Sequence, residues 1–228
     1  MTRYPVKSMA GESLSEAAVG PMGISGDREV YVRDARGDIV TARTRPKLLL
    51  HHATIDACGE PIVDGLPWQH PDVATLVADA ADEGARLVRA RSGERFDVLP
   101  LLVATDGMVS ALGVDRRRLR PNLLIGGVKE FSEREWQGRF LRIGSVVIAL
   151  ANLRDRCLMT TWDPDTAQQD KKVLTRIYRE FGGAISLNAW AVSDGLAAVG
   201  DEVELLDNEV VTPPPILGRF VKDVEGAG

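Results

Sequence analysis

The sharpest chemical feature of the sequence is a cysteine that follows two arginines. Cys157 comes directly after Arg154-Asp155-Arg156, beyond an apolar run that predicts a strand. Neighbouring guanidinium groups favour the thiolate form of a cysteine and so lower its pKa. A thiolate can ligate a soft metal ion or act as a sulfur nucleophile. Cys157 is therefore a candidate reactive residue, and the alternative is a small buried side chain that only fills space.

The other cysteine has no such surroundings. Cys58 lies in Asp56-Ala57-Cys58-Gly59, beside no cation, and is expected to be chemically inert. Two cysteines in a chain without an export signal predict free thiols in a reducing compartment. No apolar run approaches the roughly 18 residues of a membrane helix. We therefore expect a cytoplasmic protein that does not interact with a membrane.

A second group of candidates consists of polar and cationic side chains that suit an anion. The chain has 28 Lys and Arg against 33 Asp and Glu, a net charge of −5, which argues against a general nucleic-acid binder. Lys7 and Ser8 offer a charge and a hydroxyl to a phosphate, and Arg28 follows a glycine turn. Arg120 and Asn122 flank a proline that stiffens the backbone between them. Each could be an ordinary surface residue, and their convergence is a hypothesis about the fold.

Other site classes lack their motifs. His51 and His52 are adjacent and would point to opposite faces of a strand, while His70 stands alone. No zinc-ligand spacing, no Gly-x-Ser-x-Gly and no Walker-type loop is present. A zinc enzyme, a serine hydrolase of that type and a P-loop protein are therefore disfavoured.

The elements that must position these residues are mostly short strands. Helical periodicity is limited to residues 71–81, 108–112 and 170–181, with capping signals at their ends. Alternating βαβ order is absent, which disfavours a parallel nucleotide-binding sheet. The pattern predicts a mainly β protein, of mixed α/β content, built around a barrel. The expected strands are residues 29–32, 39–42, 48–55, 85–90, 96–103, 122–125, 139–143, 146–150, 184–192 and 202–206.

Composition suggests how the chain is divided. A polar, glycine-containing stretch near residues 91–97 could mark a seam. We expect an N-terminal β-barrel part at residues 1–93, a second domain at 94–208 and a proline-rich tail at 209–228.

Taken in order, these segments resemble the MOSC family, named for the C-terminal domain of molybdenum-cofactor sulfurase. They are most similar to the branch that contains the amidoxime-reducing components, in which an N-terminal β-barrel part precedes the MOSC domain. The segments that carry the resemblance are Tyr4-Pro5-Val6-Lys7-Ser8, Gly26-Asp27-Arg28, Thr41-Ala42-Arg43, Arg120-Pro121-Asn122, Glu135-Trp136, Arg156-Cys157 and Asp163-Pro164-Asp165-Thr166.

The resemblance implies a molybdopterin cofactor and a reductase of N-hydroxylated compounds. It implies Cys157 as the molybdenum ligand and catalytic residue, with Asp155 beside it as a proton donor or as a partner of the adjacent arginines. The cofactor-binding residues that it implies are Lys7, Ser8, Arg28, Thr105, Asp106, Arg120, Asn122 and Arg156. Pyridoxal phosphate binding is kept open.

The resemblance is not complete, and it leaves alternatives. The four-cysteine iron–sulfur tail of some relatives is absent, so electrons must come from a separate ferredoxin-, flavodoxin- or cytochrome-type protein. Asp155 stands where a small residue is commoner, and Ala167 replaces a frequent glycine. A sulfur carrier with a Cys157 persulfide, or a protein that only binds molybdopterin, would use the same residues.

Overall fold

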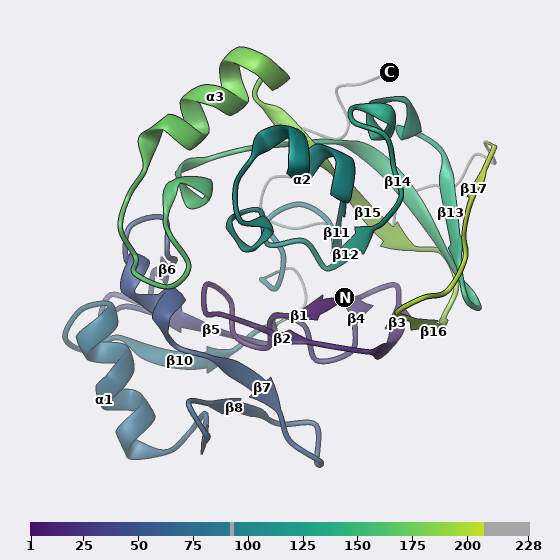
Figure 1. Ribbon diagram of the computed structural model, residues 1–228. Coiled ribbons are helices and arrows are strands. Elements are labelled where there is room, and N and C mark those ends of the chain that lie inside the picture. The colour runs from purple at the N-terminus through teal and green to yellow at the C-terminus, as the bar shows by residue number, and fades with distance from the viewer. Residues whose placement is uncertain (92–93, 208–228) are drawn as a thin grey trace.

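The computed structural model describes residues 1–91 and 94–207 and places them in two parts that share a seam (Figure 1). Elements from the first 90 residues form the lower part of the view, and most later elements form the upper part. The fold is mainly β, as the sequence predicted. The expected boundary at residue 93 and the proline-rich tail at 209–228 lie outside the described residues.

The described elements are short strands with three α-helices and several 3-10 turns. The strands are β1 (Thr2–Arg3), β2 (Glu12–Ser13), β3 (Glu16–Gly20), β4 (Gly23–Ile24), β5 (Val30–Arg33), β6 (Ile39–Val40), β7 (Ala53–Ile55), β8 (Pro61–Val63), β9 (Leu66–Pro67), β10 (Arg86–Arg89), β11 (Leu101–Thr105), β12 (Leu123–Ile125), β13 (Phe140–Ile143), β14 (Val146–Asp155), β15 (Ala184–Ala191), β16 (Gly195–Ala198) and β17 (Val203–Leu206). The helices are α1 (Pro71–Ala80), α2 (Asp106–Leu112) and α3 (Lys171–Phe181), with 3-10 turns η1 (Pro46–Leu50), η2 (Arg116–Arg118), η3 (Ser132–Trp136) and η4 (Leu158–Thr161).

A curled six-stranded sheet forms the upper part. Its order is β12-β11-β15-β14-β13-β17, and every pair is antiparallel except β11 and β12. α2 connects these two parallel strands, so β11, α2 and β12 form one βαβ unit. The expectation that βαβ order is absent is therefore wrong for this unit. A parallel pair needs such a crossover, since a tight hairpin can only join antiparallel strands.

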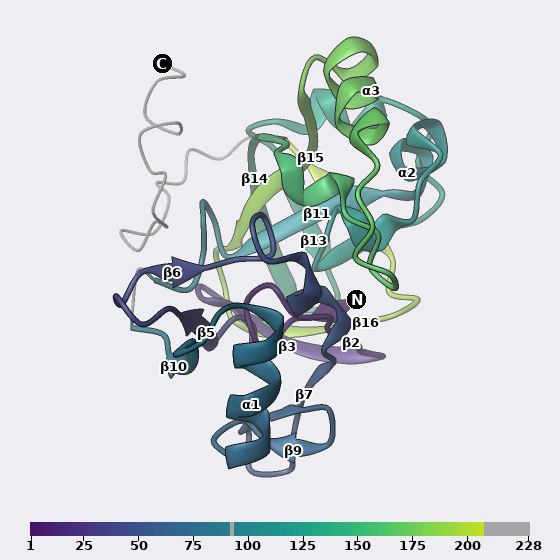
Figure 2. The same cartoon turned by 90° about the vertical axis from the view of Figure 1, so that its left-hand side faces the viewer.

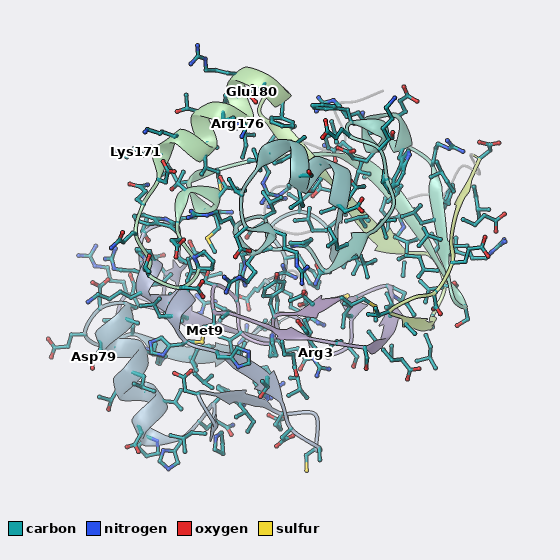
Figure 3. The ribbon with its side chains drawn as sticks, viewed as in Figure 1. Arg3, Met9, Asp79, Lys171, Arg176 and Glu180 are labelled. Carbon is teal, nitrogen blue, oxygen red and sulfur yellow. The ribbon has the colours of Figure 1, made fainter. Side chains whose placement is uncertain are left out.

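The two faces of this sheet bury different sets of apolar side chains. The inner face is lined by residues such as Leu141, Ile148 and Leu187. The outer face is covered by α2 and α3, whose Met108, Ile177 and other apolar residues pack together. In Figure 3, Arg176 is labelled on α3, and its guanidinium donates a hydrogen bond to the carbonyl of Leu112 at 2.7 Å.

The predicted helices are confirmed, with ends where the capping signals indicated. Thr105 caps α2 by accepting a hydrogen bond from the Met108 amide, and Asp170 caps α3 in the same way. Gly182 ends α3 with a left-handed backbone, φ 68°. In both views α1 and α3 lie at opposite ends of the molecule (Figure 2). Within the residues that the structure describes, no helix is long and apolar enough to cross a membrane.

The lower part has its own core, in which Val73 of α1 packs with residues such as Val30 and Leu48. The two parts are nevertheless joined by pairing between distant strands. β16 pairs with β3, and Ala17 and Val19 of β3 belong to the core of the upper sheet. Residues 16–20 are therefore held against residues 195–198, which ties the N-terminal segment to the upper part of the molecule.

One predicted strand, residues 48–55, is wrong in its first half. Residues Pro46–Leu50 form the 3-10 turn η1, and only Ala53–Ile55 are a strand. Pro46 suits the first turn of a helix because it has no amide hydrogen to leave unpaired. Leu48 and Leu49 are both buried, which adjacent residues of a strand with one buried face cannot be.

The strand predicted at residues 96–103 begins only at Leu101. Pro100 lacks the amide hydrogen that strand pairing requires, so residues 96–100 run as an irregular segment along the seam. Asp97 lies in this irregular segment and lines the pocket described below.

Candidate functional site

A half-open pocket lies at the seam between the two parts of the molecule. Eight of the ten residues that the sequence predicted for the site line it: Lys7, Ser8, Arg28, Arg120, Asn122, Asp155, Arg156 and Cys157. Thr41, Arg43, Asp97, Arg154, Met159 and Asn188 also line it. The predicted residues are spread over 150 positions of sequence, and the fold brings them to one place.

The N-terminal side of the pocket is built by two loops that pair with each other. Val6 and Val30 form a parallel bridge, and the Lys7 amide donates to the Val30 carbonyl at 2.8 Å. This pairing holds Lys7 and Ser8 next to the turn that carries Arg28. On the opposite side, Asn122 accepts hydrogen bonds through Oδ1 from the Leu102 amide (3.2 Å) and from Arg28 Nη1 (3.3 Å).

Three lining residues have a left-handed backbone although none is glycine. The φ angles are 75° for Ser8, 53° for Arg28 and 57° for Arg120. Such conformations cost about 1–3 kcal/mol each and persist where surrounding contacts impose them. The pocket therefore stores backbone strain on both of its sides.

The strain at Ser8 gives a testable result. We expect Ser8→Gly to raise the free energy of unfolding by about 1 kcal/mol, because glycine tolerates a positive φ. The same variant should bind phosphate more weakly, since the pocket loses a hydroxyl. Ala167→Gly is a matched control, because Ala167 has φ 54° and does not line the pocket. Urea unfolding and phosphate titration of both variants check this. Equal stability of Ser8→Gly and wild type would contradict it.

Asp97 connects three of the cations. Its Oδ1 lies 2.8 Å from Lys7 Nζ, and its Oδ2 lies 2.5 Å from Arg43 Nη2 and 3.7 Å from Arg154 Nη2. Burial acts to raise the pKa of Asp97, but Lys7, Arg43 and Arg154 outweigh it and hold that pKa well below 3.8. Burial also lowers the pKa of Lys7, against the opposing attraction of Asp97.

Sequence reasoning missed Asp97 because it placed residues 96–103 in a strand. A signal was present. Asp97 is the one acidic residue in the otherwise apolar run 96–103, and a charged residue in such a run needs partners. Arg43 was noted only as part of a family-like segment, yet it contacts both Asp97 and Cys157.

Cys157 lies half-buried, two residues beyond the end of β14. β14 carries irregularities in its pairing with β15 between Leu150 and Asp155, which turn its last residues toward the seam. Arg43 donates a side-chain hydrogen bond to the Cys157 sulfur. Burial acts to lower the pKa of Arg43, but the charge of Asp97 and the side-chain hydrogen bonds to Cys157 and Asp97 outweigh it and raise that pKa.

The two arginines that precede Cys157 have different partners. Arg154 faces Asp97 and donates to Asn188 Oδ1 at 3.5 Å. Arg156 is buried, and its Nη2 donates to the Leu119 carbonyl at 2.7 Å. Burial lowers the pKa of Arg156 to about 10. Asp155 is exposed, and in residues 1–91 and 94–207 it forms no ion pair, so its pairing with Arg154 or Arg156 is not observed.

Arg120 differs from the other cations that line the pocket, because no side-chain hydrogen bond or ion pair holds its guanidinium in the described part of the chain. Its Nη2 atom is buried and has no hydrogen-bond partner within the described part of the chain. Burial lowers the pKa of Arg120 to about 10. A buried donor without a partner costs free energy, so this atom is a natural contact for an anion in the pocket.

Thr105 and Asp106 are the two predicted site residues that the structure does not bring to the pocket. Thr105 is buried, caps α2, and donates to Glu133 Oε2 at 3.3 Å. The Asp106 carboxylate accepts hydrogen bonds from the amides of Gly127 (2.7 Å) and Val128 (3.0 Å). Both residues fix the loop after β12, and the geometry gives them no contact with the pocket. Cys58 is exposed, away from the pocket.

Comparison with known families decides the classification. Residues 1–97 match the MOSC N-terminal β-barrel domain, and residues 102–204 match the MOSC domain. The chain belongs to the MOSC family. The pocket therefore lies between its two family domains, and residues of both line it.

Curated relatives of this MOSC protein are amidoxime-reducing components. Mitochondrial amidoxime reducing component 2 of Macaca fascicularis is 29% identical in an alignment that covers 74% of this chain and 67% of the relative. Mitochondrial amidoxime-reducing component 1 of Mus musculus is 28% identical in an alignment that covers 74% of this chain and 66% of the relative. The chain thus spans about two thirds of the length of these relatives. Among solved structures, the YuaD protein of Bacillus subtilis matches with 13% identity and a TM-score of 0.49, over 92% of this chain and 94% of that one.

Proposed function

We propose that this protein reduces N-hydroxylated compounds with a molybdenum cofactor held in the seam pocket. The observation that carries the proposal is the pocket itself. It holds one thiol, six cationic side chains (Lys7, Arg28, Arg43, Arg120, Arg154 and Arg156) and only two carboxylates, in a chain whose net charge is −5. The names of the amidoxime-reducing relatives support the class of substrate.

The residues present fit an anionic cofactor that brings its own metal ligands. The Arg120 Nη2 atom needs an acceptor, which a phosphate would supply. Across the described ranges, no group of three or more His, Cys, Asp or Glu side chains is arranged to hold a metal ion. A single sulfur such as that of Cys157 therefore suits a metal whose remaining ligands come from the cofactor.

The proposed roles follow from where each side chain lies. Cys157 would ligate molybdenum, and Lys7, Ser8, Arg28, Arg120, Asn122 and Arg156 would hold the phosphate and pterin. When bound, the cofactor supplies the two-electron chemistry. Asp155 is exposed two residues before Cys157, a position from which it would donate a proton to the departing oxygen. Thr105 and Asp106 receive no cofactor role from this geometry.

The reaction must take electrons from outside the chain. The N–O bond breaks, the substrate nitrogen gains a hydrogen, and the oxygen leaves as water, which consumes two electrons and two protons. Both cysteines are free thiols, and their number is too small for an iron–sulfur cluster. The electrons would therefore come from a separate ferredoxin-, flavodoxin- or cytochrome-type donor.

A sulfur carrier is the second candidate, favoured by one specific observation. Cys157 is half-exposed and accepts a hydrogen bond from Arg43, an arrangement that would also stabilise a persulfide. Mass spectrometry of the protein separates the two functions. A sulfur adduct of about 32 Da on Cys157 without molybdenum would favour the carrier.

The decisive experiment for the proposed function is metal and pterin analysis, followed by turnover. The protein should be expressed in a host that makes the cofactor, and then given benzamidoxime and chemically reduced viologen. We expect close to one molybdenum and one pterin per chain, and formation of benzamidine. Purified protein with neither molybdenum nor pterin, and with no turnover, would refute the proposal.

A further inference from the structure

Tyr4 lies between the two guanidinium groups that face the pocket from opposite parts of the molecule. The Cζ atom of Arg120 is 4.1 Å from the centre of the Tyr4 ring, and that of Arg28 is 5.1 Å from it. Tyr4 itself is buried and does not line the pocket. The ring therefore stands behind the two cations rather than beside a ligand.

The ring is fixed by contacts at its backbone and at its hydroxyl. The Tyr4 amide donates to Asp27 Oδ1 at 2.7 Å, and the Tyr4 carbonyl accepts from the Arg28 amide at 2.7 Å. The hydroxyl donates to the Pro121 carbonyl at 3.4 Å, next to Arg120. Gly11 leaves room for the ring, since a Cβ there would lie 2.6 Å from Tyr4 Cδ1. Tyr4 thus links the turn before Arg28 to the loop that carries Arg120.

The kind of contact matters for the charge of the pocket. Arg28 is paired with Asp27, which compensates part of its charge. Throughout residues 1–91 and 94–207, Arg120 forms no ion pair, and the Tyr4 ring is the group that holds its guanidinium. A carboxylate at this place would neutralise the cation, whereas an aromatic face attracts it and leaves its charge available. Burial raises the pKa of Tyr4, which keeps its phenol neutral.

We propose that Tyr4 is a positioning residue that holds the guanidinium groups of Arg120 and Arg28 in place for a phosphate group. Without the ring, the two cations would repel each other and turn apart, and the Arg120 guanidinium would lose its contact with the ring face. The inference rests on the proposed function, because the phosphate is that of the bound cofactor. It can be tested without the cofactor.

The test is titration with inorganic phosphate on cofactor-free protein, made in a host that cannot synthesise molybdopterin. Calorimetry at low salt would compare wild type with Tyr4→Phe and Tyr4→Leu. We expect Tyr4→Phe to stay within about twofold of wild type, because the ring face remains. Tyr4→Leu should bind phosphate about tenfold more weakly. Tyr31→Leu is the matched control, since Tyr31 is a buried ring that carries Arg33 at 5.1 Å and does not line the pocket.

A second series covers the case in which Tyr4→Leu does not fold. Trifluorophenylalanine at position 4 keeps the shape of the ring and weakens the attraction of its face for a cation. Phosphate affinity should fall from phenylalanine to trifluorophenylalanine, with unchanged thermal unfolding. Equal affinity across this pair would overturn the role of Tyr4, even if wild type binds phosphate well and the proposed function stands. Wild-type protein that binds no phosphate at all would overturn both.

Discussion

Cys157→Ala is expected to abolish both molybdenum binding and the reduction of N-hydroxylated substrates. The Cys157 sulfur is the one thiol of the pocket, so the variant leaves no thiolate ligand for the metal. Loss of a metal ligand should lower the molybdenum content at least tenfold. Even replacement of a residue that only hydrogen-bonds to a metal ligand lowers metal affinity by roughly 10–100-fold. Metal analysis and benzamidoxime turnover of protein from a cofactor-producing host check this. The fold should persist, since a half-exposed side chain is only shortened.

Cys58→Ala is the matched control for this prediction. Cys58 is exposed, and its amide donates to Asp56 in a turn between β7 and β8, outside the pocket. Its replacement should change neither molybdenum content nor turnover. Equal molybdenum in wild type and Cys157→Ala would refute the assignment of Cys157 as metal ligand. A sulfur adduct that is present in wild type and Cys58→Ala, is lost in Cys157→Ala, and occurs without molybdenum in any of the three would instead support the carrier.

Asp97→Asn is expected to lower the free energy of unfolding by about 2 kcal/mol at pH 7. The change removes the carboxylate shared by Lys7, Arg43 and Arg154, and leaves three like charges at one wall of the pocket. Breaking a buried pair costs about 3–5 kcal/mol, and the partly exposed partners here reduce that figure. Urea unfolding measures the change. Asp165→Asn is the control, because Asp165 pairs with Arg117 on the exposed surface and its replacement should lower the free energy of unfolding far less.

The effect of Asp97→Asn should depend on pH in a defined direction. The pKa of Asp97 in the folded protein is held below its ordinary value of 3.8 by the three cations, despite its burial. A carboxylate of this kind stabilises the fold fully above its unfolded pKa, and the contribution is lost as the pH falls through the folded pKa. The difference between wild type and variant should therefore be constant from pH 7 to about 5 and shrink below 3.8. A difference that grows on acidification would show that Asp97 is not paired as described.

The sequence alone could not tell which arginine of the run at residues 116–120 belongs to the site. The four arginines are close together in the sequence but separate in the fold. Arg117 pairs with Asp115 and Asp165 on the surface, and Arg118 donates to Asp163 and the Thr161 carbonyl. Arg116 instead lines a separate apolar groove of about 790 Å³ beside β12 and β17. Only Arg120 turns into the pocket, because its left-handed backbone reverses the direction of the chain.

Local patterns in the sequence determined the parts of the structure that depend on neighbouring residues. Capping residues and helical periodicity set the three α-helices, and apolar alternation set most strands. The ordered family-like segments were enough to indicate the MOSC family, and Cys157 was distinguished from Cys58 by its flanking arginines. Each of these features is encoded within a few positions, so one sequence suffices to recognise it.

Only the tertiary structure decided which charged residues share a site. Asp97 lines the pocket because Pro100 ends strand pairing and leaves residues 96–100 irregular. Thr105 and Asp106 do not line it, because their side chains cap α2 and hold the loop after β12. Tyr4 gained a role because its ring packs between two arginines that lie 92 positions apart in the chain. Such contacts depend on how distant segments close around the seam, and that closure is set by long-range strand pairing and core packing that no local pattern specifies.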